Sequence, residues 1–233
     1  MTVTAALSPT LPLTIPPLEN GDRLPRDEFE RRYQAMPQMK KAELIEGIVY
    51  MASPLRAQSH GEPHASIMGW LAVYKAATLG IRLYDNATVR LDEENEPQPD
   101  ALLRIESGGQ SQLSDDDYIE GAPELIVEIA ASSVSIDLGK KREAYCRNGV
   151  QEYLVWRVYD RAIDWFRLED GTYVQLEADD AGILRSEIFP GLWLDSPALL
   201  SGDLAQVLAV LQQGIATAAH QVLVQNLSTL GTD

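Results

Sequence analysis

The segments QPDALLRI (98–105), PELIVEIAASS (123–133) and DLGKKREAYCRNGV (137–150) decide the fold, because the first two have the composition of strands and the third that of a helix. Two carboxylates stand out in them. Asp100 opens an apolar run, and Glu128 interrupts a run that otherwise fits a strand buried on both faces. An unpaired buried carboxylate is costly or becomes protonated, so we expect a lysine or a divalent metal ion beside these residues.

The order of these segments predicts a strand, a crossover helix and a parallel strand. Side-chain alternation puts Glu128 on one face of the first strand and the apolar residues at odd positions on the other. Asp137 is expected to cap the helix, and Gly149 to end it. Lys141 then lies in the second helical turn, from which its long side chain can reach Glu128. Residues 152–158 form the next apolar strand, after a crossover of suitable length.

The rest of the chain predicts further α/β elements. We expect helices at 25–36, 60–79, 204–213 and 216–227, two strands turning at Gly47 within 42–53, an antiparallel pair formed by 81–92 and 99–106, and hairpin turns at 170–171 and 179–182. The aromatic residues of the second half are expected to pack in the core or a dimer interface, since stacking on bases needs a basic groove. They are Trp165, Phe166, Tyr173 and Trp193.

Composition predicts one globular domain with an extension at each end. The apolar and charged fractions, 45% and 23%, are near globular averages. Residues 1–23 contain four prolines and predict a flexible tail. Residues 24–195 are expected to form the domain, and 196–233 a helical extension. The single cysteine, Cys146, excludes an intramolecular disulfide and a cysteine-based zinc cluster.

Charge and hydropathy limit the kinds of partner that the protein is expected to bind. The formal net charge is −16, from 35 acidic and 19 basic residues, which opposes tight non-specific binding of phosphate backbones. A local acidic site for a metal ion is compatible with this balance. The sequence has neither a long apolar run nor a positively charged leader, so we expect a cytoplasmic protein without a membrane span.

Several other acidic residues and histidines are candidates for auxiliary roles. Glu43 and Glu46 lie on either side of an apolar pair, as site residues or as solvated carboxylates at a sheet edge. His60 and His64 are one helical turn apart and could share a zinc ion, but no third imidazole is close in sequence. The aspartates at 115–117 lack the spacing of a calcium loop and predict a solvated loop.

The chemistry of Asp100, Glu128 and Lys141 suits phosphodiester hydrolysis. Two carboxylates on adjacent strands can chelate Mg²⁺ or Mn²⁺, which lowers the pKa of a bound water and stabilises charge on a phosphate. A nearby lysine orients that water and offsets the developing charge. We expect replacement of Lys141 by alanine to remove cleavage while leaving the fold and metal affinity nearly intact, and replacement of Lys140 to do much less.

A family resemblance sharpens this hypothesis. ELIEG (43–47), a helix entered through His64, QPDALL (98–103), PELIVEIAASS (123–133) and K-x3-Y-x3-GV-x-EY (141–153) together resemble the Uma-two family of endonucleases, in the restriction-endonuclease-like PD-(D/E)XK superfamily. The likeness covers roughly residues 24–194. It implies an αβββαβ core with a mixed sheet and a divalent-metal site.

The resemblance also implies roles for individual residues. Asp100 and Glu128 become metal ligands, and these two with Lys141 become the catalytic set. Glu43, Glu46 and His64 are possible auxiliaries. One departure is Ala130, which stands where the superfamily motif has its lysine. Lys141 on the following helix then takes that role, because it matches the family pattern better than Lys140.

The resulting hypothesis is a metal-dependent endonuclease that uses Mg²⁺ or Mn²⁺ and acts on nucleic acid, with DNA the expected substrate. The apolar hairpins and C-terminal helices suggest a homodimer. The alternative is a binding or regulatory module that keeps the nuclease fold with weak or no cleavage, which the acidic charge favours.

Overall fold

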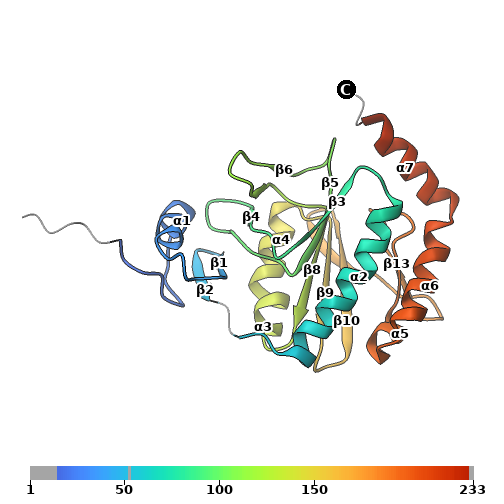
Figure 1. Cartoon of the computed structure of the whole chain (residues 1–233), viewed down its shortest axis with the longest axis horizontal. Coiled ribbons are helices and arrows are strands. Elements are labelled where there is room, and N and C mark those ends of the chain that lie inside the picture. The colour runs from blue at the N-terminus through green and yellow to red at the C-terminus, as the bar shows by residue number, and fades with distance from the viewer. Residues whose placement is uncertain (1–14, 52–53, 231–233) are drawn as a thin grey trace, which may run out of the picture.

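The computed structural model describes residues 15–51 and 54–230, arranged around a six-stranded mixed sheet of order β11-β10-β9-β8-β5-β3 (Figure 1). Its strands are β3 (Ile81–Asp85), β5 (Ala101–Ile105), β8 (Leu125–Ala130), β9 (Glu152–Arg157), β10 (Ala162–Glu169) and β11 (Thr172–Gln175). Only the β8–β9 pair within this sheet is parallel. With α2 (Glu62–Ala77) before β3 and α4 (Arg142–Asn148) before β9, the chain has the predicted αβββαβ core.

The strand predicted over 81–92 is shorter than expected. It ends at Asp85, and Asn86 follows in a left-handed conformation with φ 51°. The next segment, β4 (Val89–Arg90), leaves the main sheet and joins β6 (Gln112–Leu113) and β7 (Ile119–Glu120) in a separate three-stranded sheet. The antiparallel pairing of β3 with β5 is as predicted.

Strand β8 separates two cores, as its alternating sequence predicts. Leu125, Val127 and Ile129 pack with buried residues of α2, whereas Ile126 and Ala130 pack on the other face with residues of α4 and β9. Figure 1 shows α2 and α4 on opposite sides of the sheet. Every residue of β8 is buried, which explains why Glu128 needs partners.

The helical segment after β8 begins earlier than predicted. It consists of α3 (Val134–Ile136), a π-helical turn η2 (Asp137–Lys141) and α4. The N-cap position of α3 is Ser133, so the expectation that Asp137 caps the helix is wrong. Asp137 instead lies inside the helical segment with its side chain buried. Gly149 ends α4 with φ 85°, as predicted.

A small N-terminal module carries its own core. It contains α1 (Arg26–Gln34), β1 (Ala42–Ile45) and β2 (Ile48–Met51), with the predicted turn at Gly47 in a left-handed conformation, φ 67°. Leu18 is buried in this core, while residues 1–14 of the predicted tail lie outside the described residues. Reciprocal backbone hydrogen bonds between Leu44 and Glu96 attach the module to the main domain.

The C-terminal region shares the main core. Its elements are β12 (Ile183–Arg185), β13 (Trp193–Asp195), α5 (Ser196–Ser201), α6 (Leu204–Ile215) and α7 (Ala218–Leu230). The predicted turn at 179–182 exists, but β12 pairs with β13 and not with the strand before the turn. Trp165 is fully buried and packs edge-on against Trp70 of α2, as expected for a core residue.

No single helix within the described residues is long and apolar enough to cross a membrane. The pair α6 and α7, bent by 69°, passes the same criterion jointly by length and composition alone.

Candidate active site

A cleft of about 880 Å³ opens where β1, β5, β8 and η2 meet. Its lining includes four carboxylates and two lysines: Glu43, Asp100, Glu128, Asp137, Lys41 and Lys141. Asp100 directly precedes β5, in which Ala101 pairs with Val127 of β8. One further step of the same antiparallel register sets Asp100 opposite Glu128, so the two carboxylates are cross-strand neighbours.

Lys141 joins three of these carboxylates. Its Nζ lies 2.9 Å from Glu43 Oε1, 3.0 Å from Glu128 Oε1 and 3.8 Å from Asp137 Oδ1, and its side chain is only 5% exposed. Burial lowers the pKa of the lysine, but the three carboxylates outweigh burial and hold the pKa well above its ordinary value. The ammonium group therefore stays charged and ties the hairpin, the sheet and the helical segment together.

Glu128 is held by two donors on one oxygen. Its Oε1 accepts hydrogen bonds from Lys141 Nζ at 3.0 Å and from the Tyr145 hydroxyl at 2.9 Å. Burial raises the pKa of Glu128 to about 8; Lys141 opposes this rise, and the charges of Asp100 and Asp137 add to it. The other oxygen, Oε2, accepts no hydrogen bond from the described residues, which leaves it for a cation or water in the cleft.

Asp100 is fixed by its backbone and cationic neighbours. Its Oδ2 accepts a hydrogen bond of 2.7 Å from the Ile129 amide, while Oδ1 lies 3.4 Å from His60 Nε2 and 3.7 Å from Lys41 Nζ. Burial raises the pKa of Asp100, but His60, Lys41 and the Ile129 amide together bring it below the ordinary value. Asp100 therefore ionises at a lower pH than Glu128, its cross-strand neighbour.

The structure brings together most of the residues singled out from the sequence. Asp100, Glu128 and Lys141 meet in one cleft, with Glu43 beside them. Glu46 does not take part: its Oε1 accepts a hydrogen bond of 2.6 Å from Arg147, outside the cleft.

His64 and Lys140 lie close to the site without lining it. The Nε2 atom of His64 is 2.9 Å from the Asp100 carbonyl oxygen and 3.2 Å from Asp85 Oδ1. It therefore supports the backbone of Asp100 and does not face the other carboxylates. Lys140 is half-buried and does not line the cleft, whereas Lys141, the next residue, does.

Comparison with known proteins agrees with this fold. The family model Uma2, described as "Putative restriction endonuclease", matches residues 26–197. This chain belongs to the Uma2 family. A solved structure of "a putative nuclease belonging to DUF820" from Anabaena variabilis shares the fold with a TM-score of 0.56 and 14% identity, over 73% of this chain and 96% of that one. No curated protein sequence matches the chain.

These findings establish a restriction-endonuclease-like α/β fold for the Uma2 domain and support nuclease function in general terms.

Four residues of this Uma2 site were not predicted from the sequence, or were predicted to have another role. They are Lys41, His60, Asp137 and Tyr145. Asp137 stands four residues before Lys141, a spacing typical of helical ion pairs. That spacing was compatible with the expected helix cap as well as with an ion pair. Lys41 and His60 belong to segments remote from Asp100 in sequence, so only the tertiary fold reveals their contact with it.

The residues of the Uma2 site fit a hard divalent cation. Within residues 15–51 and 54–230, no three His, Cys, Asp or Glu side chains are placed to hold a metal by themselves, so the zinc alternative for His60 and His64 has no third ligand. Mg²⁺ requires less, because it retains several waters and uses one or two carboxylates. Asp137 Oδ2 is buried without a hydrogen-bond partner among the described residues, and Glu128 Oε2 is similarly unengaged. The oxygen-rich donor set therefore suits the predicted Mg²⁺ or Mn²⁺.

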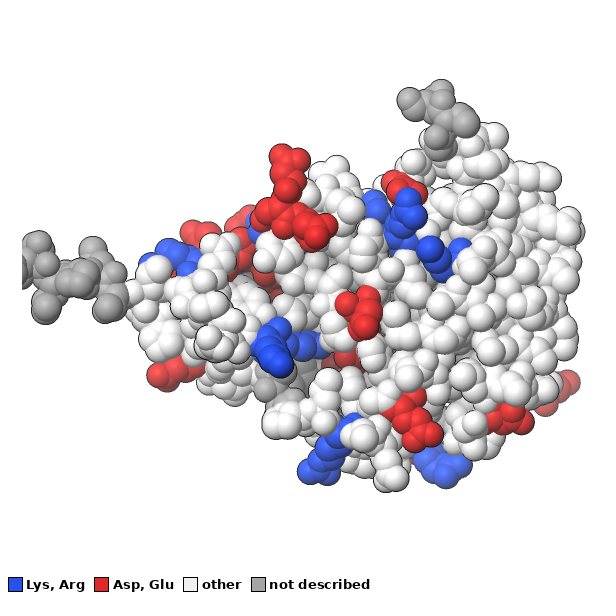
Figure 2. All heavy atoms as spheres, in the orientation of Figure 1, with Lys and Arg blue, Asp and Glu red and all other residues white. Residues whose placement is uncertain are grey.

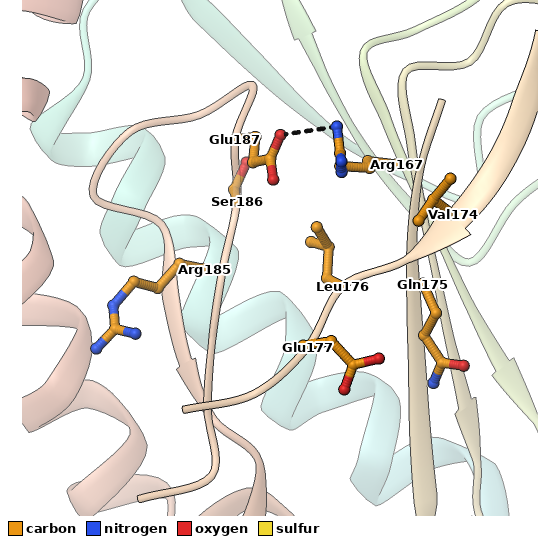
Figure 3. A pocket seen from close by; sticks show the side chains of 8 residues that line it. All are labelled: Arg167, Val174, Gln175, Leu176, Glu177, Arg185, Ser186 and Glu187. Carbon is orange, nitrogen blue, oxygen red and sulfur yellow. Dashed lines mark ion pairs between the residues drawn. The ribbon is translucent and has the colours of Figure 1, made fainter. Parts of the chain in front are cut away.

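A second hollow of about 460 Å³ lies apart from this site, between β11 and the segment that contains β12 (Figure 3). Arg167 and Glu187 face each other across it and form an ion pair of 3.3 Å. Arg185, which also lines the hollow, is paired with Asp179. These charges are already neutralised, and the predicted site residues do not line this hollow.

The surface charge of the Uma2 domain is uneven. On the face shown in Figure 2, acidic side chains gather toward α1 and the β4–β6 region, whereas a broad area over α6 and α7 carries almost no charge. The sequence accounts for the second feature, because residues 204–230 contain no Asp, Glu, Lys or Arg.

Proposed function

We propose that this Uma2 protein is a metal-dependent endonuclease that hydrolyses phosphodiester bonds in nucleic acid, with DNA the expected substrate. One observation carries the proposal: Lys141 Nζ lies 3.0 Å from Glu128 Oε1, and both line one cleft with Asp100. The three side chains come from different elements of the fold. Nothing in core packing requires charged groups to meet at a buried position, so a functional role explains their presence better than stability does.

Each residue has a distinct part in this proposal. Asp100 and Glu128 would hold Mg²⁺ or Mn²⁺, which on binding makes a coordinated water more acidic and stabilises charge on the phosphate. Lys141 donates hydrogen bonds toward the attacking water and the phosphate oxygens. The Tyr145 hydroxyl fixes the orientation of Glu128, and Glu43 holds Lys141 from the opposite side.

A cleavage assay tests the proposal directly. Plasmid and oligonucleotide substrates are incubated with the protein and Mn²⁺ or Mg²⁺, and products are followed on gels. We expect cleavage by the wild-type protein and none by Glu128→Gln, which keeps the shape of the side chain without its charge. Cleavage that persists in that variant, or in excess chelator, would contradict the proposal.

The rival function is a binding or regulatory module that keeps the nuclease fold with weak or no cleavage. The net charge of −16 favours this alternative, because strong acidity opposes the binding of polyanionic substrates that cleavage requires. Retained binding without products in the same assay would support it.

A location in the cytoplasm also stays a prediction from the sequence.

The homodimer remains part of the proposal, with α6 and α7 as its contact surface. Two copies that each carry a charge of −16 repel one another over most of their surfaces. The uncharged residues 204–230 provide a face on which this repulsion is weakest. Val222 and Leu230 on α7 are 53% and 52% exposed, which gives the face apolar area to bury.

A further inference from the structure

We infer that the cleft takes a single nucleic-acid strand, with Tyr159 as a stacking platform for a base and Arg56 as a contact for a phosphate. The inference rests on the proposed nuclease function and specifies its substrate class. It draws on three independent features of the cleft: the depth of its carboxylates, the small number of cations around it and the exposed aromatic ring at its rim.

The first feature is depth. The side chains of Glu128, Lys141 and Asp100 are only 4%, 5% and 6% exposed, although all three line the cleft. A scissile phosphate must therefore descend below the surface to meet them. The phosphates of a regular duplex lie on the outside of a wide, stiff rod, whereas a single strand can bend its backbone into a cleft of about 880 Å³.

The second feature is the limited positive charge. The basic side chains that line the cleft are Lys41, Arg56, His60 and Lys141. Lys141 is already engaged by Glu43 and Glu128, and Lys41 and His60 face Asp100. Apart from the scissile phosphate, which the proposed function assigns to Lys141 and the metal ion, Arg56 is then the basic side chain of the cleft that is left to contact a phosphate. A duplex-binding protein commonly neutralises about six or more phosphates, which these side chains cannot do in a chain of net charge −16.

The third feature is an exposed aromatic ring. Tyr159, in the turn between β9 and β10, lines the cleft and is 61% exposed. Arg56 and Ser59 line the same cleft, and the Ser59 hydroxyl, followed by the charge of Arg56, lowers the pKa of Tyr159. An exposed tyrosine beside an arginine is the combination on which single-strand-binding proteins stack bases and hold the backbone.

Fluorescence anisotropy in Ca²⁺ tests the inference with a labelled 12-nucleotide single-stranded DNA and the matching duplex. We expect the single strand to bind at least tenfold more tightly. Tyr159→Ala should weaken single-strand binding about tenfold, and Tyr159→Phe should restore it because the ring remains. Arg56→Ala should weaken binding and reduce its salt dependence by about one phosphate contact. Arg82→Ala, which removes an arginine on β3 away from the cleft, is the matched control and should change nothing.

Equal or tighter binding of the duplex, or unchanged binding by Tyr159→Ala, would overturn the inference. Cleavage of both substrates in Mn²⁺ is scored separately in the same samples. A protein that cuts the duplex faster than the single strand is a nuclease for which this inference is wrong. Absence of cleavage on either substrate counts against the proposed function itself, and absence of binding to the single strand counts against the inference.

Discussion

Lys141 Nζ lies 3.0 Å from Glu128 Oε1, although 13 residues separate the two in sequence. Lys141 is the last residue of η2, and the helical segment is kinked inside η2 at Gly139. Gly139 within the turn has non-helical angles of φ −104° and ψ −107°, so the local backbone departs from regular α-helix. A kink changes the direction of the helical residues that follow it, and Lys141 follows this one by two residues.

Lys141→Met is the first variant of interest. It leaves Glu43, Glu128 and Asp137 without their shared cation, so we expect cleavage to fall at least about 100-fold. We also expect the free energy of unfolding to fall by about 3 kcal/mol at pH 8, because breaking a buried ion pair strands its partners. Urea denaturation and the cleavage assay measure the two effects. The sequence-based expectation that loss of Lys141 leaves the fold intact therefore needs revision, since the side chain is only 5% exposed.

Lys140→Met is the matched control for that variant. The substitution removes the same charge one residue earlier, at a half-buried position outside the cleft. Stability and cleavage should both stay close to wild type. Greater damage from Lys140→Met than from Lys141→Met would show that the helical segment is placed incorrectly.

Metal affinity tests the cross-strand carboxylates. Isothermal calorimetry should detect weak Mn²⁺ binding by the wild-type protein and none by Asp100→Asn or Glu128→Gln, because each variant loses a charged oxygen ligand. Glu46→Gln is the control, since Glu46 is bound to Arg147 outside the cleft. Unchanged Mn²⁺ binding in both cleft variants would remove Asp100 and Glu128 from the metal site.

The sequence predicts the sheet and the central trio for physical reasons. A carboxylate inside a fully apolar strand is conspicuous because it needs a partner, and this made Glu128 visible. Asp100 and Lys141 follow from strand pairing and helical reach. These features depend on local hydrophobic periodicity, which can be read from a single sequence.

The missed features depend on geometry that local periodicity does not encode. Asp137 resembles a helix cap in sequence, but the helical segment begins at Val134, so the cap position falls on Ser133. The contact of His60 with Asp100 joins positions 40 residues apart, and His60 lies in η1 (Ala57–Gly61), before α2. Such non-local contacts appear only once the fold is known.

Glu152 should make stability depend on pH. The residue is fully buried, and burial raises its pKa to about 7 despite hydrogen bonds from the Ser186 hydroxyl and the backbone amides of Glu187 and Ile188. At pH values between 4.5, the pKa of the carboxyl group in the unfolded chain, and its pKa in the folded protein, the native state binds more protons than the unfolded state. The free energy of unfolding therefore falls as pH rises across that range. The difference corresponds to about 3 kcal/mol for this one group.

Glu152→Gln should remove that part of the pH dependence, because an amide does not ionise. Urea titrations at pH 5 and pH 8 give, for each protein, the change in the free energy of unfolding between the two pH values. This comparison does not require the two proteins to be equally stable. Glu187→Gln, at an exposed neighbouring position, is the control and should keep the wild-type slope. If Glu152→Gln also keeps the wild-type slope, the buried carboxyl group does not titrate with a raised pKa.

The uncharged face of α6 and α7 predicts the effect of a single new charge. Val222→Glu introduces a carboxylate at a position that is 53% exposed, so the fold should tolerate it. In a dimer formed through this face, the two new charges would be brought together and desolvated, which should return the protein to a monomer in analytical ultracentrifugation. Val174→Glu on β11, at a position 40% exposed, makes the same chemical change elsewhere and should leave the dimer intact. A wild-type protein that sediments as a monomer, or a Val222→Glu variant that remains dimeric, would exclude α6 and α7 as the contact surface.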